Sequence, residues 1–414
     1  MKENLGSKLK DAEYKEVREA ILNQEAMPSM RLFQFSGKAA RVTNVCAYNC
    51  SFIAPESFQD LAEIMYISMC GTGAGWAVES ANVEKFPQIA MQTGDKPTMH
   101  VIPDHKEGWA DSLTVGMNAW ASGKDVEFDY SQIRPEGSRL KVMGGKASGP
   151  APLQRLHSFT RQVMMARQGK RLRAIDLHDI ICMIGDCVVA GGVRRSAMIS
   201  LSDLGDEQIR DAKKGAFYVT HPHRMLANNS AVYINKPTNE EFLKEWMALI
   251  ESRAGERGIF NRGSLAKTLP ERRIKALKEY KGYFDPSGKH IVGAIGTNPC
   301  GEIILQSKQF CNLSEIVARA EDTEKSLLRK MRIATILGTY QSTLTNFPYL
   351  SKEWKEHCDR ERLLGVSITG QWDSPAVRKP EVMRKLKAEA IRVNKEYAKR
   401  FGVNESTAIT CVKP

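Results

Sequence analysis

The sequence has no apolar run of the roughly 18 to 20 residues that a membrane-spanning helix needs. Its opening, MKENLGSKLKDAEYKEV, is charged and does not resemble a secretory signal peptide. Internal repeats and low-complexity segments are also missing, which argues against a solenoid and against a long disordered tail. We therefore expect a folded, soluble protein in the cytoplasm.

Cysteine is sparse, and its number and spacing argue against a disulfide scaffold and against a structural zinc site. The 414 residues include nine cysteines, an odd number, so a disulfide scaffold is excluded and a reducing compartment is expected. No two cysteines form a CxxC pair, and no Cys/His cluster has the spacing of a zinc site. We predict no structural metal.

Positive charge is in excess, with a net charge of +12 and a pI near 9.2. It is spread along the chain, with local excesses at 267–289 and 384–400, and aromatic residues make up only 7%. This distribution does not favour nucleic-acid binding, which is typically signalled by a basic patch with aromatic residues. Anionic, phosphorylated substrates account for the charge equally well.

Helical and strand-like patterns alternate along the chain, which predicts an α/β layer or barrel with buried parallel strands. Ser57 and Asp60 have the spacing of a capping box that begins a helix ending before Gly71. The further helices are expected at 242–250, at 327–340 and from Pro380 to Gly402. Strands are expected at GWAVES, 196–201 and 407–412, and a loop or helical excursion at 265–290.

The segment 297–315, TNPCGEIILQSKQFCNLSE, concentrates chemical groups. Cys300 and Glu302 lie two residues apart, so in extended or loop backbone their side chains point to one side, and Asn298 joins them. A thiol, an acid and an amide then converge on one substrate. The alternative is a turn leading into a core strand with incidental polar residues, and spacing alone favours that alternative.

This segment resembles the finger-loop motif of class II ribonucleotide reductases, in the adenosylcobalamin-dependent, monomeric triphosphate type. Other segments resemble the same family in the same order, from Pro28 to Pro414: PSMR, YNCSF, MCGTGAG, RPEGSRLK, GGKASGPAPL, GGVRRSAMISLSDL, ANNSA, GERGIFNR, ILGTYQSTLTNF, ERLLGVSITG and ITCVKP. The resemblance implies a ten-stranded α/β barrel with a finger loop, which reduces ribonucleoside triphosphates for DNA synthesis with adenosylcobalamin as cofactor.

The resemblance also implies roles for the finger-loop residues. Cys300 takes the position of the cysteine that becomes a thiyl radical and abstracts the 3′ hydrogen of the substrate. Glu302 takes the position of the carboxylate that removes the 3′-hydroxyl proton. Asn298 takes the position that orients the ribose hydroxyls.

Two further cysteines match the thiols that reduce the substrate radical and end as a disulfide, Cys50 in YNCSF and Cys311 in FCNLSE. Their Cα atoms must then approach within about 7 Å. Cys46 is the rival of Cys50, and we expect Cys70 to be a packed small residue. A thioredoxin-like reductant is the implied partner that restores the thiols.

Nucleotide contacts are also implied by the resemblance. The matching substrate-binding positions are Ser29 and three glycines of a run that resembles a phosphate-cradling loop, Gly71, Gly73 and Gly75. Arg194 and Arg195 match the loop that links a deoxynucleotide effector to the substrate base, and for Arg195 a solvated loop charge is an equally good interpretation. Residues 102–153 resemble the effector-binding insertion.

Family members continue past VKP into a phosphate-binding SGT loop, further barrel strands and a cysteine tail. We therefore expect residues 1–414 to form a partial catalytic barrel, incomplete at its carboxyl end, with a complementary carboxyl-terminal fragment as a possible partner. A split gene, a protein-splicing element and a truncated sequence are all compatible with this end. Unpaired strand edges predict poor solubility or inactivity of the chain alone.

Two alternatives stay open at this point. The chain can be a class I catalytic subunit that receives its radical from a separate metal protein, or a nucleotide-binding fragment without activity. The intact set of Asn298, Cys300, Glu302, Cys50 and Cys311 counts against the second alternative. A class III glycyl-radical reductase is disfavoured, because the reducing cysteine pair is not expected there.

Overall fold

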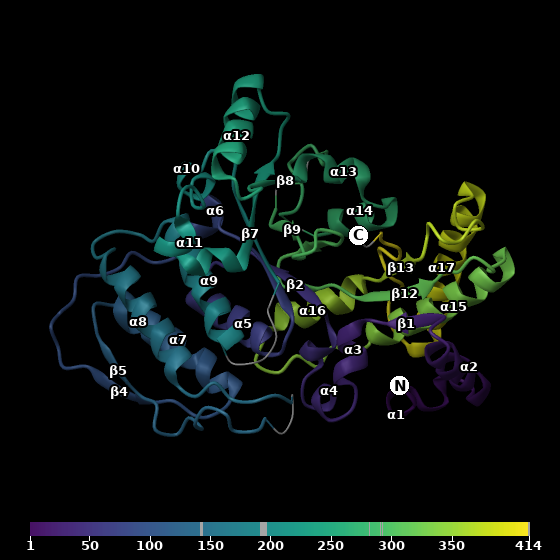
Figure 1. Cartoon of the computed structure of the whole chain (residues 1–414), viewed down its shortest axis with the longest axis horizontal. Helices are drawn as coiled ribbons and strands as arrows, with labels where there is room; N and C mark the ends of the chain where they lie inside the picture. Colours follow the sequence, from purple (N-terminus) through teal and green to yellow (C-terminus); the bar gives the residue numbers. More distant parts are fainter. Residues whose placement is uncertain (141–143, 191–196, 281, 290, 292, 413–414) are drawn as a thin grey trace. The chain divides into compact units, whose positions relative to one another are not determined.

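The computed structural model describes residues 1–140, 144–190, 197–280, 282–289, 291 and 293–412 (Figure 1). Arg194 and Arg195 lie outside the described residues. The chain divides into two compact units. Unit 1 comprises Met1–Asn49, Thr268–Phe284 and Gly301–Pro414, and unit 2 comprises Cys50–Lys267 and Asp285–Cys300.

Unit 2 is built on five parallel strands in the order β2-β3-β6-β7-β8. They are β2 (Cys50–Ile53), β3 (Gly73–Ala77), β6 (Met198–Asp203), β7 (Ala227–Tyr233) and β8 (Gly258–Asn261). The register aligns Cys50 with Gly73 and Ala74 with Met198. Every residue of β2 and β3 is buried, as expected for parallel strands covered on both faces.

Helices connect these strands, as α/β alternation requires. The first crossover is α5 (Phe58–Met69), which begins with the predicted capping box because Ser57 and Asp60 each bond to the other's backbone N–H. Between β3 and β6 lie α6 (Ser80–Val83), β4 (Thr98–Val101), α7 (Lys106–Ala121), β5 (Val126–Asp129), α8 (Ala151–Met165) and α9 (Ala174–Ala190). Strands β4 and β5 form a separate parallel pair.

The later connections in unit 2 are shorter. The chain passes through α10 (Glu207–Arg210), α11 (Phe217–Thr220) and η3 (Pro222–Leu226) to β7, and through α12 (Asn239–Ser252) to β8. After β8 come η4 (Arg262–Ser264), α13 (Leu265–Thr268) and α14 (Glu271–Lys278), which confirms the helical excursion predicted after 265.

Unit 1 contains a three-stranded sheet, in which β12 (Leu313–Val317) pairs antiparallel with β1 (Ala26–Pro28) and parallel with β13 (Gly365–Thr369). Two long helices, α15 (Glu324–Gln341) and α17 (Pro380–Phe401), pack side by side beside it. The remaining elements of unit 1 are α1 (Lys2–Leu5), η1 (Gly6–Lys8), α2 (Asp11–Leu22), α3 (Met30–Phe35), α4 (Lys38–Val42), η2 (Asn44–Ala47), α14 (Glu271–Lys278), β10 (Ile304–Gln306), β11 (Gln309–Phe310) and α16 (Lys352–Glu361).

Most predicted elements are confirmed, including the helices at 242–250 and 327–340 and, from Met198 on, the strand expected at 196–201. The predicted strand at 407–412 is wrong, since only Thr410 forms a single parallel bridge, to Val366. The carbonyls of consecutive residues Ala408 and Ile409 both accept bonds from the β13 segment. In a regular strand successive carbonyls point to opposite sides, so this irregular backbone interrupts the ladder.

Candidate active site

The segment that leads to Cys300 is held against the strands of unit 2. Strand β9 (Ile295–Thr297) contacts β2 and β3, and the chain then turns at Pro299 and Cys300. A Cβ on Gly75 would lie 2.4 Å from the Thr297 carbonyl oxygen, closer than any side chain tolerates. Gly75 is therefore required by the close approach of β9 to β3.

The thiol of Cys50 lies next to the same segment. A Cβ placed on Gly73 would be 3.5 Å from Cys50 Sγ and 3.5 Å from Pro299 Cγ. Cys50 Sγ and Pro299 Cγ therefore lie no more than about 7 Å apart. Unit 2 thus brings Cys50 close to Pro299, the residue that precedes Cys300, although Cys50 and Pro299 are 249 positions apart in sequence.

Burial differs sharply among the predicted site residues of unit 2. Asn298 is fully buried and Cys50 is 4% exposed, whereas the Cys300 side chain is exposed. Thr297 Oγ1 donates a hydrogen bond to the Asn298 carbonyl oxygen at 3.2 Å. The turn therefore has a buried amide at its base and an accessible thiol at its tip.

A buried ion pair, which the sequence did not predict, fixes the start of β9. Both guanidinium Nη atoms of Arg262 lie 2.7 Å from the carboxylate oxygens of Glu79, and Arg262 Nε donates to the Ile295 carbonyl at 2.8 Å. The two side chains are 4% and 9% exposed. Bidentate pairs of this kind fix geometry as well as contributing energy.

The boundary between the two units falls between Cys300 and Gly301. The second part of the segment 297–315, from Gly301 onward, therefore belongs to unit 1. Gly301 has a φ of 84°, so the backbone between Cys300 and Glu302 is a turn and not an extended strand. Glu302 is half-buried and Cys311, directly after β11, is fully buried. Whether Glu302 and Cys311 act together with Cys300 and Cys50 stays a prediction.

A buried carboxylate organises the two short strands that precede Cys311. Glu361 is fully buried and accepts hydrogen bonds from Gln306 and Gln309, both at 2.9 Å, and from the Arg273 guanidinium. Arg273 also donates to the Ile304 carbonyl at 2.6 Å. This network holds β10 and β11 in place, and hence the backbone that leads to Cys311.

The residues predicted to contact the substrate, Ser29 and the glycines of 71–75, also have structural roles. Ser29 caps α3, because its hydroxyl accepts a bond from the Leu32 N–H and donates to the Ala47 carbonyl. Gly71 lies in a turn with a φ of 84°, whereas Gly73 and Gly75 belong to β3. The Gly71–Gly75 run is therefore a turn that leads into a buried strand, and its contact with the substrate stays a prediction.

Cys46, the rival of Cys50, and Cys70 are both buried in the structure. Cys46 is fully buried in η2 and its thiol donates to the Thr43 carbonyl at 3.2 Å, so it does not share a helix with Cys50, which begins β2. Cys70 is fully buried, as predicted for a packed small residue, and lies 3.5 Å from Lys106 Nζ. Burial raises the pKa of its thiol.

The region predicted as an effector insertion contains a buried polar cluster. His157 on α8 is 3% exposed, stacks on Phe128 with ring centroids 4.0 Å apart, and interacts with Ser112 Oγ at 3.0 Å and the Tyr130 hydroxyl at 2.8 Å. Burial lowers the pKa of His157 to about 3, so the ring is neutral at pH 7. The cluster joins α7, β5 and α8.

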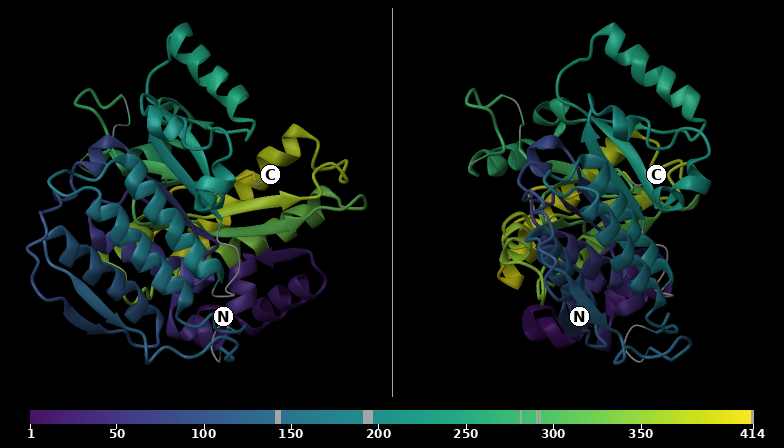
Figure 2. Two further views of the ribbon diagram at one scale, coloured as in Figure 1. Left: turned by 60° about the vertical axis from the view of Figure 1, so that its left-hand side comes forward. Right: turned by 90° about the vertical axis from the view of Figure 1, so that its left-hand side faces the viewer.

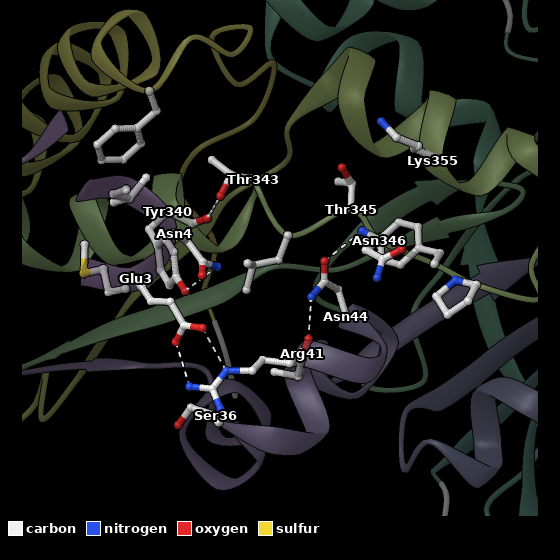
Figure 3. A pocket seen from close by; sticks show the side chains of 18 of the residues that line it. Glu3, Asn4, Ser36, Arg41, Asn44, Tyr340, Thr343, Thr345, Asn346 and Lys355 are labelled. Atoms are coloured by element: carbon white, nitrogen blue, oxygen red, sulfur yellow. Dashed lines mark hydrogen bonds and ion pairs between the residues drawn. The ribbon is translucent and has the colours of Figure 1, made fainter. Parts of the chain in front are cut away.

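A large cavity of about 810 Å³ lies elsewhere in unit 1, among α1, α4 and the residues after α15 (Figure 3). Its wall includes the exposed Arg41–Glu3 ion pair and the Asn44–Asn346 hydrogen bond. None of the predicted site residues lines it. We place the candidate active site at the turn of unit 2 that carries Cys300, because the Cys50 thiol lies beside this turn and the buried Arg262–Glu79 pair holds the strand that leads to it.

The described part of the chain shows neither a metal-binding cluster nor a membrane-spanning helix. Within it, no group of three or more His, Cys, Asp or Glu side chains is arranged to hold a metal ion. Among the described helices, none is both long enough and apolar enough to cross a bilayer.

Comparisons with known proteins point to one family. The family model of the insertion domain of B12-dependent ribonucleotide reductases matches residues 74–164. An adenosylcobalamin-dependent ribonucleoside-triphosphate reductase of Euglena gracilis is 30% identical over 331 residues, which cover 78% of this chain and 42% of that protein. The enzyme of the same name from Lactobacillus leichmannii is 25% identical, covering 99% of this chain and 66% of its own length.

A solved structure of an enzyme of the same kind is also similar to this chain. The crystal structure of a B12-dependent, class II ribonucleotide reductase superposes with a TM-score of 0.77 at 23% identity, over 97% of this chain and 65% of that one. This likeness establishes the α/β fold of that structure for the chain. The chain spans between two fifths and two thirds of the length of these relatives.

Proposed function

We propose, from the premise that this chain is a member of the B12-dependent, class II ribonucleotide reductases, that it forms the part of such an enzyme that carries the radical cysteine. The activity proposed for the complete enzyme is reduction of ribonucleoside triphosphates to 2′-deoxyribonucleotides. One observation supports this most directly: the accessible Cys300 thiol follows a strand packed beside the Cys50 thiol.

In the proposed reaction Cys300, as a thiyl radical, takes the 3′ hydrogen of the ribose and returns a hydrogen at the end. Glu302 accepts the 3′-hydroxyl proton, and Asn298 orients the ribose hydroxyls. The 2′-hydroxyl leaves as water while Cys50 and Cys311 supply two electrons and two protons and become a disulfide. The balance is one nucleotide and one dithiol converted to one deoxynucleotide, one disulfide and one water.

Adenosylcobalamin supplies the unpaired electron when it is bound. The exposure of Cys300 fits this cofactor, since hydrogen transfer requires that the thiol can be reached from outside the chain. The described residues single out no cobalamin contacts, and we assign none. What this chain contributes is the position of the thiol, fixed through β9, Gly75 and the Arg262–Glu79 pair.

The nucleotide contacts and partners belong to the same proposal. We assign substrate contacts to Ser29 and the Gly71–Gly75 segment, and effector binding to residues 102–153 within the matched insertion domain, with Arg194 and Arg195 linking the two. The deoxynucleotide effector, a thioredoxin-like reductant and a carboxyl-terminal polypeptide that supplies the rest of the barrel are the expected partners. The neutral, buried His157 supports a structural role inside the insertion.

The cofactor requirement tests this proposal. The chain is combined with a polypeptide that corresponds to the carboxyl-terminal part of its relatives, and deoxynucleotide formation from a triphosphate is measured with and without adenosylcobalamin. Product formed only with the cofactor supports the class II assignment. Activity that needs a metal-containing radical partner instead moves the chain to class I, and effector binding without any turnover would make it a regulatory fragment.

A further inference from the structure

The cavity of unit 1 drawn in Figure 3 is large enough for an organic ligand. It encloses about 810 Å³, and volumes of about 300–1,000 Å³ are typical of such sites. Figure 2 shows the amino-terminal helices of unit 1, in purple, beside the yellow-green segments of the same unit. Asn4 Nδ2 donates to the Tyr340 hydroxyl at 3.2 Å and joins these two parts of the wall. The cavity therefore lies within one compact unit.

The wall of this cavity carries an excess of positive charge. Four basic side chains line it: Lys8, Arg41, Lys352 and Lys355. Glu3 is the one acidic side chain among the described residues of the wall, and it pairs with Arg41 at 2.7 Å. Asp359, outside the wall, pairs with Lys355. The charges of Lys8 and Lys352 stay unbalanced, so the cavity favours an anionic ligand.

Thr345 provides a buried hydroxyl in this wall. The residue is 8% exposed, and its side chain has no hydrogen-bond partner in the part of the chain that the structure describes. The backbone beside it is held firmly, because Asn346 N donates to Asn44 Oδ1 at 2.7 Å and Asn44 N donates to the Asn346 carbonyl at 2.8 Å. A buried hydroxyl without a partner is unfavourable until a ligand or a water completes its hydrogen bond. Thr345 is therefore a preformed contact for a polar group of a ligand.

The amino end of α16 adds a further feature that favours anions. Ser351 and Lys352 line the cavity, so the first turn of this ten-residue helix borders it. The partial positive charge of a helix amino terminus and its free N–H groups attract phosphate and carboxylate groups. Glu353, the acidic residue of this turn, is not among the described residues of the wall.

Another part of the wall is apolar, with four residues that include two aromatic rings: Tyr340, Leu344, Phe347 and Leu350. Tyr340 and Phe347 are 7% and 8% exposed, so each ring presents only a small part of its surface to the cavity. Nucleotide bases pack favourably on apolar and aromatic surface. One cavity thus combines a cationic part with an apolar part, as a ligand with phosphates and a base requires.

We propose that this cavity binds a nucleoside triphosphate, whose phosphates lie at Thr345, Lys352 and the amino end of α16 and whose base packs against the apolar part of the wall. A lone phosphate ion would leave most of the volume empty and the apolar part uncovered. The site is separate from residues 102–153, which belong to unit 2 and to which we assign the effector. Binding at this cavity does not depend on the proposed reductase reaction, since every residue of its wall belongs to unit 1.

Photolabelling of the 414-residue chain with 8-azido-ATP tests this proposal. Mass spectrometry identifies the labelled peptides, and competition with unlabelled ATP gives a dissociation constant for each of them. We expect label within 340–350, and an ATP dissociation constant there raised at least about tenfold by Lys352→Glu combined with Lys355→Glu. Lys275→Glu combined with Lys278→Glu is the matched control, because it makes the same charge change at the same spacing on α14, outside the cavity wall. The control should leave the dissociation constant unchanged.

Thr345→Val tests the hydroxyl without a change of charge, and it should weaken ATP binding at this site at least about threefold. Thermal unfolding of each variant confirms that it is folded. Label confined to 102–153, or label at 340–350 that the Lys352 and Lys355 substitutions leave unchanged, would overturn the proposal and leave the proposed reductase function intact. So would competition by inorganic triphosphate as strong as that by ATP, or loss of the label when the carboxyl-terminal polypeptide binds, since that polypeptide would then fill the cavity.

Discussion

The guanidinium of Arg273 and the carboxylate of Glu361 form a fully buried ion pair, with Nε–Oε1 at 2.9 Å and Nη2–Oε2 at 3.2 Å. Thr407 Oγ1 donates a further bond to Oε1 at 2.9 Å. Burial alone would raise the pKa of Glu361, but the Arg273 charge and the hydrogen bonds outweigh it, so the pKa lies below its ordinary value. The pair joins α14, α16 and the segment after α17 to strands β10 and β11, which precede Cys311.

Replacing one partner of this pair should be severe. Glu361→Gln leaves the Arg273 charge buried without its counter-ion, and we expect the free energy of unfolding to fall by about 3–5 kcal/mol in urea denaturation. Combining it with Arg273→Met removes the uncompensated charge and should recover part of the loss. A single Glu361→Gln variant as stable as the unmodified chain would contradict the assigned role of the pair.

The close approach of β9 to β3 predicts that Gly75→Ala disturbs the Cys300 segment. The added methyl group meets the Thr297 carbonyl, and we expect a loss of about 1–3 kcal/mol in unfolding free energy together with reduced activity of the assembled enzyme. Gly205 has open space around it, so Gly205→Ala serves as the control and should change stability by less than about 0.5 kcal/mol. Equal effects of the two substitutions would refute this explanation of Gly75.

Local signals in the sequence predicted a large part of this architecture. The Ser57–Asp60 capping box and the helix from Pro380 to Gly402 depend on residues close together in sequence, and both are confirmed. The strand expected at 407–412 was wrong, because alternating apolar character does not fix which backbone groups find partners. The Gly71–Gly75 run resembles a phosphate-cradling loop in its glycines, although two of them belong to β3, where they permit close packing.

The ion pairs around the candidate site were beyond prediction from the sequence. Arg262 and Glu79 are 183 positions apart, and Arg273 and Glu361 are 88 apart, so no periodicity connects them. Arg273 lies in a segment with many charged neighbours, 271–279, where the buried side chain has no distinguishing pattern. The site cysteines were predicted through family resemblance, because spacing alone favoured an ordinary turn.

Accessibility predicts the order in which the thiols react. Cys300 is exposed and Cys411 half-exposed, whereas the other seven cysteines are buried, and burial raises the pKa of Cys187 and Cys358 to about 12. We expect brief alkylation of the native chain to label Cys300 first, since both access and thiolate fraction control the rate. Peptide mass spectrometry measures this. Labelling of Cys50 or Cys311 as fast as Cys300 would contradict the burial described for them.

The neutral His157 predicts a dependence of stability on pH. Burial lowers its pKa from 6.5 to about 3, so the unfolded chain binds a proton more readily between these values. The stabilising contribution is complete above about pH 6.5 and is lost as the pH falls toward 3, at about 1.4 kcal/mol per pH unit. Chemical unfolding of His157→Gln between pH 4 and 6 should therefore show a slope smaller by about one proton. An unchanged slope would mean that His157 is protonated in the folded chain.

The most direct test of the account concerns Cys300 in the enzyme assembled with the carboxyl-terminal polypeptide and adenosylcobalamin. Deoxynucleotide formation is compared between Cys300→Ser and Cys411→Ser, since Cys411 is a partly accessible thiol with no proposed role in the reaction. We predict that Cys300→Ser lowers turnover at least about a thousandfold, because a hydroxyl does not replace a thiol as hydrogen carrier, while Cys411→Ser stays within about threefold of the unmodified enzyme. Substantial turnover by Cys300→Ser would contradict the assignment of the radical to this residue.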